Sequence, residues 1–167
     1  MNIRKDIVVH RSVKEVWEVL GTQFEDAYKW ARGLDSSRGH GKSSFEGLAH
    51  SNRTCEVPGF GKIDEVILIF DRVNHILSYK VEEGFPTFIS SAVNTWTLKK
   101  EGLGTRVSMN LEMRTTGIKG ALMGPMMKMN LNKLITGVVS DFKVYVETGK
   151  PSEHKAKELA KAARKAA

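Results

Sequence analysis

Four polar side chains in the middle of the chain have types and spacings that could form a binding or catalytic cluster. Arg53 and Glu65 stand on either side of the turn-forming residues 58–61, Pro-Gly-Phe-Gly, so a chain reversal there would place them on adjacent strands. Buried together, the guanidinium and the carboxylate would neutralise each other or bind the polar end of a ligand. Exposed, they would form a cross-strand ion pair of little consequence, and the sequence leaves both arrangements open.

Tyr79 and Asn94 complete this group. Apolar and polar residues alternate from 106 to 114, with Met109 and Met113 in the apolar set, so we expect that set to face the core. The same alternation turns Tyr79, Asn94 and Trp96 inward from the predicted strands 76–82 and 88–98. Each polar member could be either a hydrogen-bonded core residue or a ligand contact.

Methionines form the apolar part of the candidate site. Met109 and Met113 end the last predicted strand, and Met123 and Met127 lie near the start of a predicted long helix. Methionine is unbranched and polarizable, so it adapts to exchangeable apolar partners, although at helical spacing it is most often ordinary core. Three glycines and a proline between residues 117 and 125 would loosen or kink the same part of the helix.

A sheet and this long helix must position the cluster. Residues 118–147 carry large apolar residues at spacings of three and four, which predicts one helix. Its predicted inward face consists of Met123, Met127, Leu131, Leu134, Val138, Phe142 and Tyr145. We expect residues 131–145 to anchor the sheet and residues 118–129 to form the adjustable wall of a ligand cavity, facing Met109, Met113, Phe60 and Phe85.

The remaining pattern predicts an α+β fold. A strand over 2–9 is followed by two short helices, the first opened by a capping box of Ser12 and Glu15 and the second spanning 24–31. A weak strand is expected within 34–48. The alternating segments that follow are joined by turns too short for crossovers, which requires antiparallel neighbours. We therefore expect roughly seven strands, with helices gathered on one face of the sheet.

Composition favours one domain and a basic tail. The 167 residues fit a single core, for which we expect the bounds 1–149, followed by a tail over 150–167. The tail holds six Lys or Arg and two Glu, a net of +4 out of the chain's +7. It is compatible with a helix, and we expect it to be solvated and partly frayed, with attachment to an acidic partner as the alternative. Since most of the charge is there, no specific nucleic-acid binding is expected.

Sequence signatures of catalysis, metal binding and export do not occur. The histidines have no short metal-ligand spacing, no GxSxG elbow is present, and Cys55, the only cysteine, has no base beside it in the sequence. We therefore expect no metal, no cofactor and an inert Cys55. No apolar run approaches the length of a transmembrane helix and no signal peptide is recognisable, so a cytoplasmic protein is expected.

Several short motifs in a characteristic order resemble a known superfamily. They are Ser12-Val13 with Val16-Trp17, Arg53, Glu65 with Asp71, Ser78-Tyr79, and Trp96 followed by Gly-Thr-Arg-Val at 104–107. Over residues 2–148 the chain resembles the START-like (SRPBCC) superfamily, and within it the polyketide cyclase/dehydrase and lipid-transport family. The resemblance implies a helix-grip fold, as in the birch-pollen allergens. In it, a curved antiparallel sheet is wrapped around the long C-terminal helix and encloses an apolar cavity for a lipid, sterol or polyketide.

The resemblance also assigns entrance gates to the aromatic loops. Phe60, Phe85 and Phe88 would occupy the loops that act as gates in ligand-binding members, including the plant abscisic-acid receptors. The glycines on either side of Phe60 permit a mobile flap. The polar contacts inside the cavity would then be Arg53, Glu65, Tyr79 and Asn94. No catalytic residue of the cyclase enzymes can be matched to this chain.

Three functions follow as hypotheses. The first is a carrier or sensor that binds a hydrophobic small molecule without converting it. The second is a cyclase- or dehydratase-like enzyme using the same cavity. The third is an interaction module whose basic tail contacts an acidic partner, and each is compatible with a monomer or a homodimer.

Overall fold

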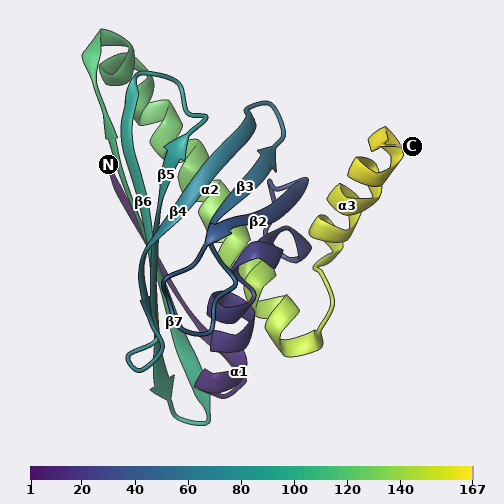
Figure 1. The fold of residues 1–167 in the computed structure, drawn as a ribbon. Coiled ribbons are helices and arrows are strands. Elements are labelled where there is room, and N and C mark those ends of the chain that lie inside the picture. The colour runs from purple at the N-terminus through teal and green to yellow at the C-terminus, as the bar shows by residue number, and fades with distance from the viewer. Residues whose placement is uncertain (167) are drawn as a thin grey trace.

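The fold is a single strongly bent sheet that wraps around helices (Figure 1). The structure, a computed structural model, describes the backbone of residues 1–166 and the side chains of residues 1–164. The strands are β1 (Asn2–Val9), β2 (Ser36–Lys42), β3 (His50–Val57), β4 (Gly61–Asp71), β5 (Ile76–Glu83), β6 (Ile89–Glu101) and β7 (Gly104–Thr115).

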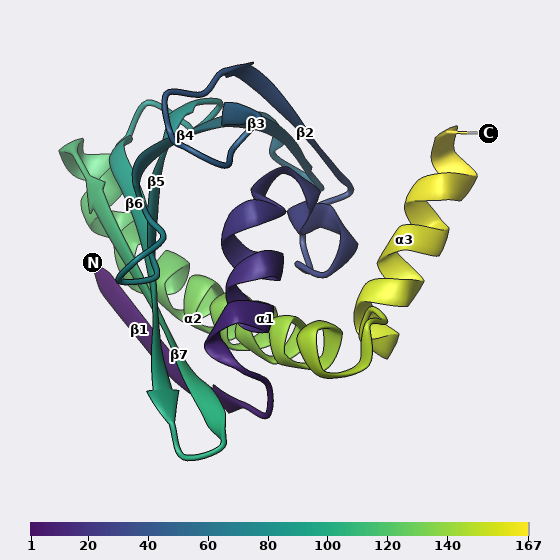
Figure 2. The ribbon, with the colours of Figure 1, turned by 60° about the horizontal axis from the view of Figure 1, so that its bottom comes forward.

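The seven strands form one antiparallel sheet in the order β1-β7-β6-β5-β4-β3-β2. Viewed from below, the sheet curves around the short N-terminal helices, and the long helix closes the open side (Figure 2). The predicted α+β helix-grip fold is therefore confirmed. One boundary matters for the site: β6 begins at Ile89, so Phe88 belongs to the preceding loop.

The short helices after β1 fill the concave side of the sheet. Ser12 and Glu15 form the predicted capping box at the start of α1 (Val13–Trp17). The chain continues through a single π-helical turn, η1 (Glu18–Thr22), into the 3-10 helix η2 (Phe24–Lys29). Trp17, Leu20 and Phe24 are buried against the sheet, so these helices occupy much of the space that the bend creates.

The long helix α2 (Gly117–Thr148) confirms most of the predicted inward face, since five of its seven residues are buried or packed on the core: Met127, Leu131, Val138, Phe142 and Tyr145. Ile135, Val139 and Phe142 are buried, whereas Leu134 is 41 % exposed and Met123 is 40 % exposed. The apolar residues of this helix cover more than half of its circumference, and successive residues are about 100° apart. Sequence spacing therefore identified the helix and most of its inward face, but it wrongly included Met123 and Leu134 and left out Ile135 and Val139.

The first half of α2 mostly faces away from the sheet. Ile118, Leu122, Met126 and Met129 are each more than half exposed, and Met127 is the large side chain of residues 118–129 that packs on the core. The predicted adjustable wall is therefore wrong for this half, with Met127 as the exception. The helix simply extends beyond the part of the sheet that its second half covers (Figure 1).

The C-terminal tail is a helix, α3 (Glu153–Ala166), whose first turn is attached to the body. Lys155 is fully buried and donates from Nζ to the carbonyl oxygen of Leu34, and Ser152 Oγ donates to Asp141 Oδ1 at 2.5 Å. The expectation of a solvated tail is wrong for this turn and for Glu158, which accepts from the Gly33 amide at 3.0 Å, while the end of α3 stands away from the body (Figure 2). Within the described residues, no helix combines the length and hydropathy needed to cross a bilayer.

Candidate functional site

The Arg53–Glu65 pair lies on the inner, concave face of the sheet. The two residues are directly opposite each other in the β3–β4 register. Their exposed fractions are 5 % and 7 %, and Arg53 Nε donates to Glu65 Oε2 at 2.6 Å. The ambiguity left by the sequence is thus resolved in favour of a buried pair, which places a cation and an anion on the inner face of the sheet.

Two aromatic rings and a backbone carbonyl surround the rest of the guanidinium. Arg53 NH1 donates to the carbonyl oxygen of Phe24 at 2.6 Å. Its Cζ lies 4.0 Å from the ring centroid of Phe24 and 4.9 Å from that of Tyr79, both within cation–π range. Burial by itself would lower the pKa of Arg53, but the negative charge of Glu65 outweighs it, so the pKa is raised and Arg53 stays charged.

Cys55 lies beside this pair on β3. Its side chain is fully buried, and Sγ is 3.5 Å from Glu65 Oε2. Burial raises the pKa of the thiol to about 12, so the reactive thiolate is scarce at neutral pH. This environment agrees with an inert cysteine.

We expect Cys55 to resist alkylation in the folded protein. Iodoacetamide should modify it at least about 100-fold more slowly than it modifies the same cysteine in urea, because the thiol is both buried and neutral. Mass spectrometry of the alkylated protein measures this ratio. Rapid modification of the native protein would show that solvent reaches the Arg53–Glu65 pair.

Tyr79, Asn94 and Trp96 form a second polar group on the same face. Tyr79 and Asn94 are register partners on β5 and β6. The Tyr79 hydroxyl oxygen accepts a hydrogen bond from Asn94 Nδ2 at 2.9 Å and one from Trp96 Nε1 at 3.4 Å. Burial raises the pKa of Tyr79 to about 12, so the hydroxyl keeps its proton and can donate it to a further acceptor.

The amide oxygen of Asn94 is buried without a hydrogen-bond partner among the described residues. A buried polar atom without a partner costs about 1–3 kcal/mol. If the oxygen and nitrogen of the amide were exchanged, the oxygen could accept from the Tyr79 hydroxyl, but the NH2 group would then be buried without a partner. The exchange would therefore move the unsatisfied group rather than remove it. The inner face therefore presents one free acceptor and one available hydroxyl proton next to each other.

The predicted methionines separate into two groups. Met109 and Met113 are buried on β7 with the alternation predicted for that strand, and Met127 is half-buried against the same core. Met123 points to the exposed side of α2 and does not join them. Three of the four predicted methionines thus lie on the interior surface that carries Tyr79 and Asn94.

The three predicted gate residues lie in loops at one end of the sheet. Phe60 follows Gly59 in the β3–β4 turn, where Gly59 and Gly61 both have positive φ, and its side chain is 56 % exposed. Its ring is 6.2 Å from that of Phe85 in the β5–β6 loop, in an edge-to-face arrangement. Phe88, in the same loop, accepts a backbone hydrogen bond from Thr116 at the start of α2.

Sequence reasoning missed the contribution of Phe24 to this site. Its ring and its carbonyl oxygen both hold Arg53. The apolar spacing of residues 24–31 placed Phe24 on a buried helix face, but no sequence signal shows that a carbonyl at this position is free to accept a side-chain hydrogen bond. A carbonyl oxygen has two lone pairs, so the one on the first residue of this short 3-10 helix can accept from Arg53 in addition to any bond within the helix.

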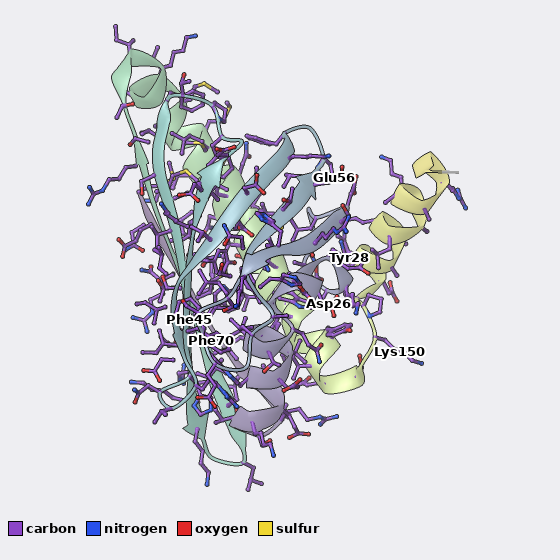
Figure 3. All side chains as sticks on the ribbon, viewed as in Figure 1. Asp26, Tyr28, Phe45, Glu56, Phe70 and Lys150 are labelled. Carbon is purple, nitrogen blue, oxygen red and sulfur yellow. The ribbon has the colours of Figure 1, made fainter. Side chains whose placement is uncertain are left out.

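Two hollows lie on the surface near β2, away from the predicted site. The larger, about 770 Å³, is lined by residues that include Arg38, His40, His50 and Asp64. The smaller, about 350 Å³, includes Asp26 and Tyr28, which Figure 3 labels. None of the predicted ligand-binding residues lines either hollow. Among the described residues, no group of three or more His, Cys, Asp or Glu could hold a metal ion.

Residues 1–147 match the protein family described as polyketide cyclase / dehydrase and lipid transport. The chain belongs to this family. The match ends just before the basic tail, and no curated protein sequence matches the chain.

Solved structures with the same fold support the architecture. A START superfamily protein from Mycobacterium smegmatis superimposes with a TM-score of 0.72 at 12 % identity, covering 89 % of this chain and 99 % of that one. Ginseng major latex-like protein 151 from Panax ginseng gives a TM-score of 0.64 at 14 % identity, covering 87 % and 96 %. Ara h 8.0201 gives 0.66 at 12 % identity, covering 87 % and 97 %. At these identities the likeness establishes the helix-grip fold alone.

Proposed function

We propose that the protein binds a hydrophobic small molecule with at least one hydroxyl or carbonyl oxygen, between the inner face of the sheet and α2. The family and fold are those of proteins that bind hydrophobic ligands. The observation that carries the proposal is the buried Asn94 amide oxygen without a partner, beside the Tyr79 hydroxyl. A ligand hydroxyl would donate to Asn94, and a ligand carbonyl would accept from Tyr79.

The surroundings of these two groups favour an apolar ligand body. Trp96, Met109 and Met113 are buried on the same face, and Met127 of α2 packs against the core to which they belong. Methionine side chains adapt to partners of different shape. The Arg53–Glu65 pair supports the polar end of the site by fixing Tyr79 through the guanidinium–ring contact. In this proposal Phe60 and Phe85 line the entrance.

Ligand binding explains these features better than acid–base catalysis does. The pKa of Tyr79 is raised to about 12, far from the neutral range in which a general base is most effective. Glu65 is held by Arg53 at 2.6 Å, so its carboxylate is already engaged. A cyclase- or dehydratase-like reaction remains the alternative hypothesis. It would require Tyr79→Phe to lower turnover far more than it lowers binding.

Native mass spectrometry tests the binding proposal directly. Protein purified without organic solvent is expected to carry a small molecule that is released on unfolding. Asn94→Leu should lower its occupancy about tenfold, because the substitution removes the acceptor from the interior. The matched control is Asn110→Leu, the same change on the outer face of β7, which should leave occupancy unchanged.

Two results would count against the proposal. One is a protein that carries no small molecule and also binds no 8-anilinonaphthalene-1-sulfonate. The other is equal loss of occupancy in Asn94→Leu and Asn110→Leu, which would indicate a general loss of stability rather than loss of a contact.

A further inference from the structure

The first half of α2 presents an apolar stripe to solvent. Ile118, Leu122, Met126 and Met129 are 81 %, 77 %, 56 % and 54 % exposed. Their spacings of four, four and three place them along one side of the helix, opposite the side on which Met127 packs. Large side chains on a free surface are normally scattered, so a continuous stripe of four indicates a partner.

The only charged residues in the sequence around this stripe are basic. Residues 113–140 contain four Lys or Arg, namely Arg114, Lys119, Lys128 and Lys133, and no Asp or Glu. The helix N-terminus adds to the positive potential, because Thr116 provides no side-chain cap and the first turn has no acidic residue. The partner's surface is therefore apolar and negatively charged.

The stripe is continuous with the predicted entrance to the interior. The amide of Thr116 donates to the carbonyl oxygen of Phe88 at 2.8 Å, which joins the start of α2 to the β5–β6 loop. Phe85 in that loop contacts the exposed Phe60 of the β3–β4 turn. Figure 1 shows the start of α2 and these two connections at the same end of the molecule, at the top. We call this end the apolar end, defined by the four α2 residues and Phe60.

We propose that the apolar end docks on the surface of a bilayer that contains anionic lipids. The exposed side chains enter the boundary between headgroups and acyl chains, and the flanking lysines contact lipid phosphates. The helix lies in the interface and does not span the bilayer. In this position the gate residues would face the lipid phase, from which an apolar ligand could enter without crossing water.

A second copy of the chain fits this surface less well. In a twofold dimer the same patch meets itself, so lysines on the two copies would approach one another without carboxylates from residues 113–140 to pair with them. The adjoining end of β5 carries two exposed carboxylates, Glu82, which is already paired with Lys80 at 3.0 Å, and Glu83, so they are fewer than the four cations of residues 113–140. An anionic lipid surface provides both the apolar phase and the missing negative charge.

Flotation with vesicles tests the proposal and needs no ligand. The protein is expected to float with mixed phosphatidylcholine and phosphatidylglycerol vesicles, and much less with phosphatidylcholine alone. Leu122→Asp combined with Met126→Asp should lower the bound fraction about tenfold or more, since it removes apolar contact and adds repulsion. Because both residues are exposed, the thermal midpoint of the double variant should match that of the unaltered protein.

Two control variants make the test specific to the apolar end. Leu103→Asp makes the same change at a fully exposed leucine in the β6–β7 turn, at the opposite end of the sheet, and should leave flotation unchanged. Lys157→Glu combined with Lys161→Glu removes positive charge from α3 and should lower flotation only slightly.

Each contrary outcome would overturn the proposal. The first is that the unaltered protein does not float with the vesicles. The second is that Leu103→Asp lowers the floating fraction as much as the α2 double variant does. The third is that the α3 variant loses flotation while the α2 variant keeps it. The apolar end would instead be a contact with a second copy if the protein is dimeric in sedimentation, does not bind vesicles, and becomes monomeric in the α2 variant. A negative vesicle result leaves the interior binding site untouched, because its occupancy is measured separately.

Discussion

Glu65→Gln is expected to lower the free energy of unfolding by about 3–5 kcal/mol, a large part of the stability of a domain of this size. The variant keeps the shape of the side chain but leaves the guanidinium of Arg53 buried, with the carbonyl of Phe24 as its remaining strong acceptor. Urea denaturation followed by tryptophan fluorescence measures the loss. Glu101→Gln is the matched control, because Glu101 pairs with Arg106 on the surface, and it should change stability by less than about 1 kcal/mol.

A double variant separates the structural role of the pair from its role in binding. Replacing Arg53 by Met and Glu65 by Leu removes both charges, so no unpaired ion is left and most of the lost stability should return. If the pair supports ligand binding through Tyr79, the double variant folds but carries less small molecule in native mass spectrometry. If Glu65→Gln lowers the free energy of unfolding by less than about 1 kcal/mol, water reaches Arg53 and the pair behaves as a solvent-exposed ion pair.

The strands were predictable because their alternation is clean. Val107, Met109, Leu111 and Met113 are buried on β7 as the period of two requires, and Tyr79 occupies the predicted face of β5. The face of the sheet on which the side chains of Arg53 and Glu65 lie was not predictable. A shift of one residue in the β3–β4 register would have broken the pairing of these two side chains, and only the assembled sheet fixes that register.

The helices were harder to orient than to detect. The capping box of Ser12 and Glu15 located α1, and apolar spacing located α2 within one residue at each end. Spacing alone could not fix the margin of the buried face of α2, since the buried Ile135 and Val139 are about as apolar as the exposed Leu134 that was predicted instead. Nor could it show that the first half of the helix leaves Met126 and Met129 exposed.

The attachment of α3 was missed because lysine is rarely buried. Lys155 lies in a basic, Ala-rich segment whose composition is typical of a solvated helix, and burial lowers its pKa. It is buried because Leu34 O accepts from it and Glu158 lies 3.6 Å away. Glu158 is a local partner on α3, but the position of Leu34 depends on the path of the loop after η2, which no local pattern in the tail encodes.

Asp141→Asn is expected to destabilise the protein by about 2–3 kcal/mol and to release α3 from the body. Asp141 is 1 % exposed and accepts two hydrogen bonds from Arg32, at 2.6 and 2.8 Å, and a third from Ser152. The side chain of Arg32 is 25 % exposed, so water compensates part of its lost pairing, and the expected cost is smaller than for Glu65.

Hydrogen exchange distinguishes release of α3 from general loosening. Ser152 also accepts from the Lys155 amide at 3.1 Å, so loss of the Asp141 contact should speed exchange across the first turn of α3 while the β6 and β7 amides stay protected. The matched control is Asp26→Asn, which breaks an exposed pair with Lys29 and should leave α3 unchanged. Unchanged exchange in Asp141→Asn would mean that the contacts of Lys155 with Leu34 and of Glu158 with the Gly33 amide are enough to anchor the helix. Gly137 provides the second check: a Cβ there would lie 2.3 Å from an Arg32 nitrogen, so Gly137→Ala should displace the guanidinium and reproduce the release of α3 without altering a charge.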